Sequence, residues 1–318
     1  MMDISVTAFL AAIVVMGGPV ILAALGETIT EKAGVVNLSL DGTILLAAMV
    51  GFVTACATGQ PGLGLLAGAL TGGAVAAIVA FIGVHLGQSQ VAVGFALTFL
   101  CRDLAYFLGS GHARVEGPQF EPLPLPLLSE LPVVGKALFS QTLVIYLSFV
   151  AIPLCFYLLY RSRWGLIIRS VGENPEACWA RGINPITVRM LATTAGGAMV
   201  GLAGAGYSLA VKPGWGQPQG CEGIGWIALA LVIFGSWHPL RVVAGAYLFG
   251  FLQLMGIYFQ DAFTTIPPQI FQVAPFPLMI FTLVIIHFSH RRNDVLARWL
   301  QLFSGTPPKA MGRPYRRD

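Results

Sequence analysis

Charged side chains are scarce in this sequence, and their scarcity excludes a soluble globular protein. Asp, Glu, Lys and Arg make up 10% of the 318 residues, whereas hydrophobic residues make up 56%. A soluble domain carries about 25% charged residues. A chain this poor in charge is therefore an integral membrane protein.

Paired cysteines and catalytic motifs are also missing. The cysteines show no CxxC or metal-ligand spacing and mostly lie in or beside apolar runs, where cysteine acts as a small hydrophobe. They are Cys56, Cys101, Cys155, Cys178 and Cys221. The Gly135-Lys136 pair lacks the other residues of a phosphate-binding P-loop. Because HExxH and GxSxG are missing as well, we predict no catalytic residue, no metal site and no cofactor bound by this chain, which disfavours an intramembrane enzyme.

Long apolar runs predict an all-α, polytopic membrane protein, because about 20 apolar residues form a helix that crosses the bilayer. Such runs lie at 6–25, 38–57, 62–83, 89–109, 141–160, 190–211, 240–258 and 273–289. The apolar stretch 223–235 is shorter and is either a short span or a re-entrant half-helix. We predict about 8–10 transmembrane helices with one or two broken or re-entrant segments, in one domain over residues 1–290.

Basic residues are concentrated in two segments, which sets the predicted orientation. Of the 18 Lys and Arg residues, 12 lie either in the polar island at 161–189 or beyond His290. Basic residues in short loops resist translocation. We therefore place the polar island and a basic tail at 291–318 in the cytoplasm, and the N-terminus and the loop 110–140 outside. Topology alone accounts for the basic tail, so we predict no nucleic-acid partner.

The polar island contains the signals of a short capped helix. Asn174 is a candidate N-cap and Pro175 suits the first helical position. Residues 176–181 would form one or two turns, which Gly182 would close in a left-handed conformation. A second start signal, Asn184-Pro185, returns the chain to the bilayer. A capped helix on the cytoplasmic face offers a handle for a partner.

The sequence GENPEACWARGINPITVR at 172–189 resembles the cytoplasmic coupling segment of permease subunits of bacterial ABC importers. The resemblance is to the nucleoside and simple-sugar branch, which is related to the ribose and branched-chain amino-acid permeases. Residues 26–42, GETITEKAGVVNLSLDG, are similar to the segment that follows the first helix in that branch. A third match is GWIALALVIFG at 225–235. Together the matches cover most of the chain in the expected order.

This resemblance implies an ATP-driven importer of nucleosides or simple sugars that works by alternating access. A separate ABC ATPase would hydrolyse ATP-Mg and move the coupling segment of the permease. The coupling residues would be Glu173, Asn174, Pro175, Glu176, Arg181 and Gly182.

The resemblance also implies further partners and a location. A second permease subunit, commonly a different chain in nucleoside systems, and an extracytoplasmic solute-binding protein would complete the importer. The permease domain would lie in the bacterial cytoplasmic (inner) membrane as a multi-pass protein in contact with lipid, with its C-terminus in the cytoplasm.

A cluster of polar residues lies between the first two predicted spans. Ionisable groups inside a bilayer usually pair with each other or line a pathway. Gly34 interrupts a helical pattern here and Asn37 could cap the next helix, so a broken helix could offer backbone groups to sugar hydroxyls. We predict Glu27, Asn37 and Asp41 as pathway residues. The alternative is a cytoplasmic loop with surface ion pairs of Glu31 or Lys32.

Two further features inside predicted spans are ambiguous. Arg102 and Asp103 either pair with each other or with another helix, or face the cavity and recognise a polar group of the substrate. Trp226, with Phe234 and Trp237, is either an interfacial anchor or a platform that stacks on a sugar or base. We include Arg102, Asp103 and Trp226 among the pathway residues.

A secondary transporter driven by an ion gradient is the alternative function, with Asp41 or Asp103 as the proton site. Such a transporter needs no coupling helix, which disfavours it. Asp41-Gly42 and Pro61 are echoed near 180 residues later by Glu222-Gly223 and Pro239. An echo of this kind is typical of transporters built from two halves with the substrate site between them.

Small residues crowd two predicted spans, at 62–73 and 196–206. Gly and Ala allow helices to approach closely in lipid, so helix packing is the default interpretation. The alternative is a substrate path lined by exposed backbone.

Overall fold

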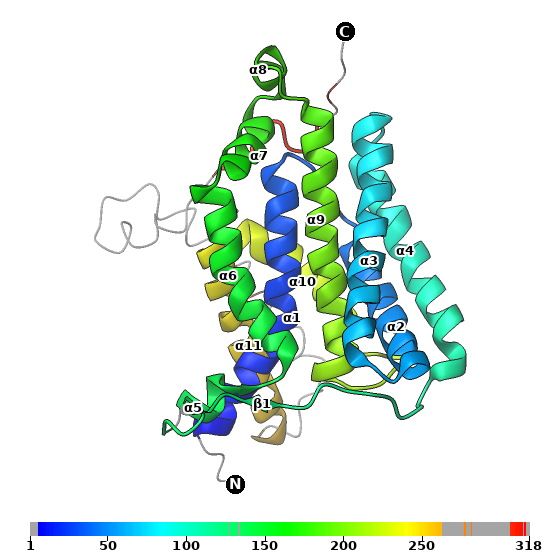
Figure 1. Cartoon of the computed structure of the whole chain (residues 1–318), viewed down its shortest axis with the longest axis vertical. Helices are drawn as coiled ribbons and strands as arrows, with labels where there is room; N and C mark the ends of the chain where they lie inside the picture. The colour runs from blue at the N-terminus through cyan, green and yellow to red at the C-terminus, as the bar shows by residue number, and fades with distance from the viewer. Residues whose placement is uncertain are drawn as a thin grey trace.

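The computed structural model describes residues 6–262, except positions 127 and 133, together with residues 277, 281, 306–313 and 315. Seven helices among these residues are long and apolar enough to cross a membrane, which confirms an all-α polytopic protein (Figure 1). Strand pairing in the described part is limited to β1 (Leu123–Pro124) with β2 (Ser140–Gln141). The predicted span at 273–289 lies outside the described residues, apart from two isolated positions.

The long helices form one bundle. They are α1 (Val6–Lys32), α2 (Leu40–Thr58), α3 (Pro61–Ala80), α4 (Gln90–Gly109), α6 (Leu143–Arg161), α9 (Pro185–Gly206) and α11 (Pro239–Ala262). Short π- or 3-10 turns extend α3, α4 and α9: Phe81–His85, Ser110–His112 and Tyr207–Val211. The shorter helices are α5 (Val134–Leu138), α7 (Arg163–Glu173), α8 (Pro175–Ala180) and α10 (Ile224–Phe234). The predicted short apolar segment is thus the separate helix α10.

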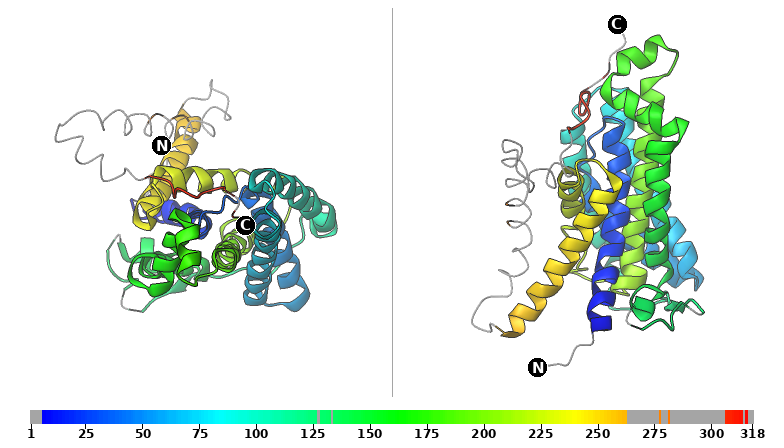
Figure 2. Two further views of the ribbon diagram at one scale, coloured as in Figure 1. Left: turned by 90° about the horizontal axis from the view of Figure 1, so that it is seen from above. Right: turned by 90° about the vertical axis from the view of Figure 1, so that its left-hand side faces the viewer.

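The bundle has two distinct ends. Helices α7 and α8 and the segment 306–313 lie at one end, and helix α5 lies at the other, near the start of α1 (Figures 1 and 2). We refer to these as the α8 end and the α5 end. Helix α1 therefore runs toward the α8 end, and α9 runs away from it.

Glycines bring α3, α9 and α1 into backbone contact. A Cβ at Gly72 of α3 would lie 2.5 Å from the backbone nitrogen of Gly201 and would clash with the carbonyl oxygen of Gly197. A Cβ at Gly26 of α1 would clash with the carbonyl oxygen of Gly196 in the same way. These small residues therefore serve helix packing, as predicted. The glycine backbones face one another rather than an open path.

Replacing Gly72 with Ala is expected to destabilise the protein, whereas the same change at Gly73 is not. The added methyl at Gly72 meets backbone atoms that cannot rotate away, and overpacking of this kind costs about 1–3 kcal/mol. A Cβ at Gly73 would have its nearest neighbours 3.6 Å away, at ordinary contact distance. Thermal unfolding in detergent measures both variants. Equal melting temperatures would contradict the packing.

The described helices contain two similar runs of opposite direction. In the first run, α1 leads through an irregular connection to α2 and then to α3, which begins at Pro61. In the second run, α9 leads in the same way to α10 and then to α11, which begins at Pro239. Helix α1 packs against α11, and correspondingly α9 packs against α3. The sequence echo between Asp41-Gly42 and Glu222-Gly223 coincides with the starts of α2 and α10. The two runs are therefore arranged as inverted halves.

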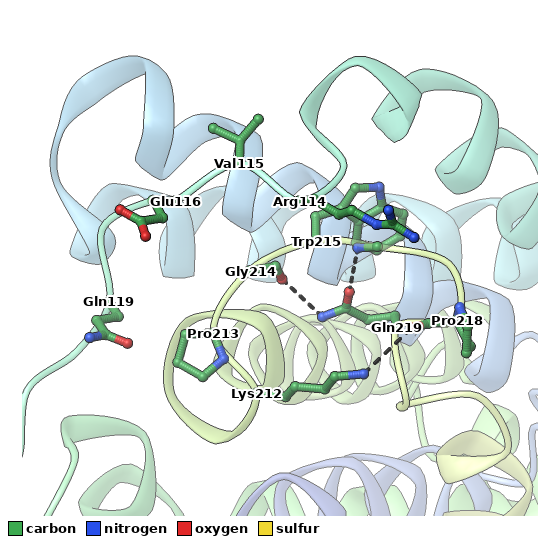
Figure 3. Close-up of a pocket in the computed structure, with 12 residues that line it drawn as sticks. Arg114, Val115, Glu116, Gln119, Lys212, Pro213, Gly214, Trp215, Pro218 and Gln219 are labelled. Atoms are coloured by element: carbon green, nitrogen blue, oxygen red, sulfur yellow. Dashed lines mark hydrogen bonds between the residues drawn. The ribbon is translucent and has the colours of Figure 1, made fainter.

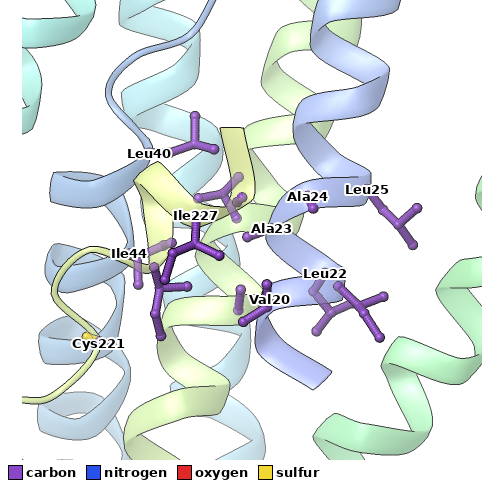
Figure 4. Packing of buried hydrophobic residues seen from close by; sticks show 14 of the residues in the cluster. Val20, Leu22, Ala23, Ala24, Leu25, Leu40, Ile44, Cys221 and Ile227 are labelled. Carbon is purple, nitrogen blue, oxygen red and sulfur yellow. The ribbon is translucent and has the colours of Figure 1, made fainter. Parts of the chain in front are cut away.

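Apolar side chains fill the space where the two halves meet. Figure 4 shows α1, α2 and α10 converging there through the side chains of Val20, Ala23, Leu40, Ile44 and Ile227, while Leu22 and Leu25 extend from the other side of α1. All of these side chains are buried. This apolar contact places the start of α2 beside α10, close to the middle of α1.

Candidate functional site

The connection between α1 and α2 is a true helix break. Gly34 has φ +89°, a left-handed conformation that suits glycine, and residues 35–39 are not helical. The prediction that Asn37 caps α2 is wrong, because Ser39 occupies the N-cap position. The Asn37 Oδ1 instead accepts hydrogen bonds from the Ser39 backbone N–H (3.1 Å) and hydroxyl (2.7 Å). Asn37 thus closes the turn that precedes the helix.

Side chains of α1 and α4 satisfy the backbone of this break. The Oε1 of Glu27, which is fully buried, accepts a hydrogen bond from the Asn37 backbone N–H at 3.2 Å. Gln90 accepts one from the Val36 N–H at 2.9 Å, and the Thr98 hydroxyl donates to the Leu38 carbonyl at 2.6 Å. These backbone groups are therefore not free for a sugar hydroxyl in this conformation. The Oε2 of Glu27 is buried without a hydrogen-bond partner among the described residues.

Asp41 joins the two halves of the molecule. Its Oδ1 accepts hydrogen bonds from the backbone N–H groups of Gly223 (2.7 Å) and Gly225 (3.2 Å), at the start of α10. A Cβ at Gly225 would clash with the Asp41 nitrogen, so the two helix starts are in direct contact. A carboxylate at a helix N-terminus is favoured by the N–H groups and by the helix dipole. Asp41 lies in the first turn of α2 and also at the N-terminus of α10, so both helix starts favour its carboxylate.

A second acidic residue of α1 reaches the turn between α10 and α11. The Trp237 Nε1 donates a hydrogen bond to the Glu31 carboxylate, and both side chains are buried. The interpretation of Trp237 and Phe234 as interfacial anchors is wrong, because each is at most 6% exposed inside the protein. Sequence reasoning missed this pair. The spacing of Glu27 and Glu31, four residues apart on one helix face, was the signal available.

The remaining predicted pathway residues lie along α4 and the start of α10. Arg102 and Asp103 are both exposed on α4. The half-buried Trp226 ring packs against Phe95 of α4, with the ring centroids 5.5 Å apart. One face of α4 carries three aromatic side chains and one arginine, which follow one another at spacings of four, three and four residues. We call this the α4 face: Phe95, Phe99, Arg102 and Tyr106.

Glu222 fixes the connection that leads into α10. Its carboxylate accepts hydrogen bonds from the Tyr106 hydroxyl and from the backbone N–H groups of Gln219 (2.7 Å) and Gly220 (2.5 Å). Burial would raise the pKa of Glu222, but these hydrogen bonds outweigh it and lower the pKa below the ordinary value of 4.5. The connection is therefore fastened to α4 by an ionised carboxylate.

Acid is expected to loosen this connection. Because the pKa of Glu222 is lower in the folded protein, its stabilising contribution is present above the ordinary pKa and is lost as pH falls through the folded pKa. The melting temperature of the wild type should therefore fall more steeply below about pH 4.5 than that of Glu222→Gln. The comparison is made at matched pH values. Parallel curves for the two proteins would contradict this role.

A polar cavity of about 620 Å³ opens at the α5 end, between the loops that precede α5 and α10 (Figure 3). The Arg114 N–H donates to the Trp215 carbonyl at 3.0 Å, and the Gln219 Nε2 donates to the Gly214 carbonyl at 2.9 Å. The cavity wall carries charged side chains of both signs: Arg114, Lys212 and Glu116. The loop 110–140, which is predicted to lie outside, and the loop that precedes α10 are therefore joined into one surface.

Helix α8 stands at the opposite end as the sequence predicts. The Asn174 Oδ1 accepts a hydrogen bond from the Ala177 N–H at 3.0 Å, and Pro175 is the first helical residue. Gly182 closes the helix with φ +80°. The other predicted coupling residues, Glu173, Glu176 and Arg181, are exposed. Sequence reasoning missed α7, which precedes α8 within the polar island.

Residues 9–283 match the family described as "Branched-chain amino acid transport system / permease component". The chain belongs to this family.

Relatives of this permease are ABC transporter subunits. The chain is 41% identical over 78% of its length to a protein of Haloferax volcanii named putative glucose ABC transporter permease, covering 77% of that protein. It is 32% identical over 96% of its length to the guanosine ABC transporter permease of Bacillus subtilis, covering 95% of it. A nucleoside ABC transporter permease of Lactococcus lactis is 31% identical over 84% of this chain and 87% of its own length. No solved structure shows a significant match.

Family membership settles the class of protein. The chain is a multi-pass permease subunit of an ABC transporter and not an enzyme, because ATP hydrolysis in these transporters belongs to a separate chain. The secondary-transporter alternative is not favoured. Association with an ATPase and other ABC components follows from the family.

Proposed function

We propose that this permease imports nucleosides or simple sugars, with the α8 end in the cytoplasm and the α5 end outside. The substrate class is supported by the relatives, whose names specify glucose, guanosine and nucleosides. The α4 face is compatible with both, because aromatic rings pack on sugars and bases. The basic residues of the polar island support the orientation.

The observation that carries this proposal is the contact of Asp41 with the start of α10. In alternating access, one half of the protein moves against the other around a central site. The hydrogen bonds from Gly223 and Gly225 to Asp41 cross that boundary. Separation of α2 from α10 would free a carboxylate and two N–H groups for substrate hydroxyls. Glu27 and Asn37 support the same junction from the α1–α2 break.

A second permease subunit would cover the α4 face. Helix α4 is the least buried of the seven described spans, because only 22% of its apolar stretch lies inside the protein. A charged side chain facing the bilayer centre costs about 2.5–3.5 kcal/mol on insertion scales. Arg102 and Asp103 are exposed on α4, so a partner or an aqueous path is a better neighbour than lipid. The substrate would pass between the two subunits, beside Trp226.

The two ends of the bundle suit two further partners. An ABC ATPase that binds ATP-Mg would grip α8 and its neighbours: Glu173, Asn174, Pro175, Glu176, Arg181 and Gly182. An extracytoplasmic solute-binding protein would dock over the cavity at the α5 end, where Arg114, Lys212 and Glu116 offer charged groups of both signs for pairing. In this orientation the protein would lie in the bacterial inner membrane, with its C-terminus in the cytoplasm.

Purification of the tagged chain in mild detergent tests the assembly. We expect an ATPase and a second permease to co-purify, and Arg102→Leu with Asp103→Leu to reduce the recovered second permease. Competition of labelled uridine uptake by glucose, other nucleosides and leucine tests the substrate class. Inhibition by leucine alone would contradict the proposed substrates.

A further inference from the structure

Arg189 is a fully buried arginine of α9 whose partners are backbone carbonyls. Its Nε donates to the Ala33 carbonyl at 3.2 Å, its Nη1 to the Arg313 carbonyl at 2.9 Å and its Nη2 to the Ala310 carbonyl at 3.1 Å. The side chain is 0% exposed. A buried charge is costly unless such partners are in place. The guanidinium therefore ties α9 to the end of α1 and to a segment near the C-terminus.

The same C-terminal segment is bonded to two other parts of the α8 end. The Ala310 N–H donates to the Gly172 carbonyl of α7 at 2.9 Å, and the Gly312 N–H donates to the Gly34 carbonyl at 3.0 Å. Ala310 is 7% exposed. We call residues 308–313 the C-terminal bridge, because they connect α7 with the α1–α2 break (Figure 2).

The contacts around the bridge leave little room for independent movement. A Cβ at Gly172 would clash with the Lys32 carbonyl oxygen, so α7 touches the end of α1 directly. A Cβ at Gly34 would lie 3.3 Å from both the Ala310 oxygen and the Gly172 Cα. A displacement of α7 must therefore move either the bridge or the break.

We propose that the C-terminal bridge transmits movement of α7 and α8 to the α1–α2 break, with Arg189 as its positioning residue. This inference rests on the proposed function, because it assumes that an ATPase moves α8. The planar guanidinium presents several donors in a fixed fork, which lets one side chain hold three carbonyls at once. A lysine has a compact ammonium on a flexible stem and cannot reproduce this geometry.

The test is the number of solute molecules transported per ATP hydrolysed, measured in proteoliposomes that contain the complete transporter. Ala310→Pro removes the N–H that bonds Gly172 but keeps the carbonyl that Arg189 needs. Arg189→Lys removes the fork but keeps the charge. Both variants are expected to lower the transport ratio at least fivefold while the ATPase rate stays within twofold of wild type.

Two matched controls separate the bridge from its surroundings. Arg313→Ala keeps the carbonyl that Arg189 uses, and Lys309→Ala changes an exposed side chain in the same segment. Both controls should keep the wild-type ratio.

Gly172→Ala is a third test variant, beside Ala310→Pro and Arg189→Lys. It forces α7 away from Lys32 and should lower the transport ratio as Ala310→Pro does.

The outcomes distinguish the inference from the proposed function. If wild type shows no ATP-dependent uptake, the proposed function fails. If wild type is coupled and the bridge variants keep its ratio, only the inference is overturned. A loss of assembled transporter at unchanged ratio also overturns it, because that is what a purely structural role predicts.

Discussion

Asp41→Ala is expected to reduce uptake at least tenfold without loss of the associated ATPase. The change leaves the N–H groups of Gly223 and Gly225 without their acceptor at the start of α10. Each buried donor left unsatisfied costs about 1–3 kcal/mol, and about 1.4 kcal/mol corresponds to a tenfold change in an equilibrium. The conformation in which α2 and α10 are joined would therefore lose population. Uptake and ATPase recovery are measured on the same purified complex.

Asp41→Asn is the matched comparison, because the amide keeps one oxygen acceptor but not the charge. Hydrogen bonds to a charged acceptor are roughly twice as strong as neutral ones. We therefore expect uptake between those of wild type and Asp41→Ala. If both variants take up every candidate substrate normally, Asp41 is not a pathway residue.

Gly182→Val is expected to uncouple ATP hydrolysis from uptake while the protein still assembles. Gly182 has φ +80° and a Cβ there would meet no atom within 4 Å, so the effect comes from the backbone alone. A left-handed conformation costs an L-residue roughly 1–2 kcal/mol, and a β-branched residue is a poor fit to it. Relief of this strain would reorient α8 against the ATPase. Uptake per ATP hydrolysed is the readout, and we expect it to fall severalfold.

Gly182→Asn is the control for this variant, because asparagine tolerates the left-handed region better than other non-glycine residues. It should retain most of the coupled uptake. If Gly182→Val and Gly182→Asn both transport normally, the assignment of α8 as the coupling helix is wrong. Equal loss in both variants would point to a requirement for glycine other than its conformation.

Local signals made the α8 region and the helix break predictable from sequence. Asn174 and Pro175 act within a few residues of chain, so their capping role depends little on tertiary structure. Gly34 likewise marks the break through its own backbone conformation. The small residues of α3 and α9 were predictable as packing surfaces, because close approach in lipid requires them.

Long-range contacts could not be predicted in the same way. Arg189 was counted with the basic residues of the polar island, yet it is buried. Its burial could not be predicted, because its hydrogen-bond partners are backbone carbonyls, which leave no mark in a sequence. Trp237 was interpreted as part of an interfacial anchor or a stacking platform, because its true partner, Glu31, lies 206 residues away and leaves no local signal. Helix α7 was missed because its arginines are interspersed with apolar residues in a segment that reads as a polar connection.

The measurement that tests the account most directly is uptake of labelled nucleoside and glucose into proteoliposomes containing the co-purified transporter and its solute-binding protein. We predict that uptake requires ATP on the ATPase side, persists when ionophores collapse ion gradients, and falls at least tenfold in Asp41→Ala. Uptake by the chain alone, driven by an imposed ion gradient and independent of ATP, would contradict the account.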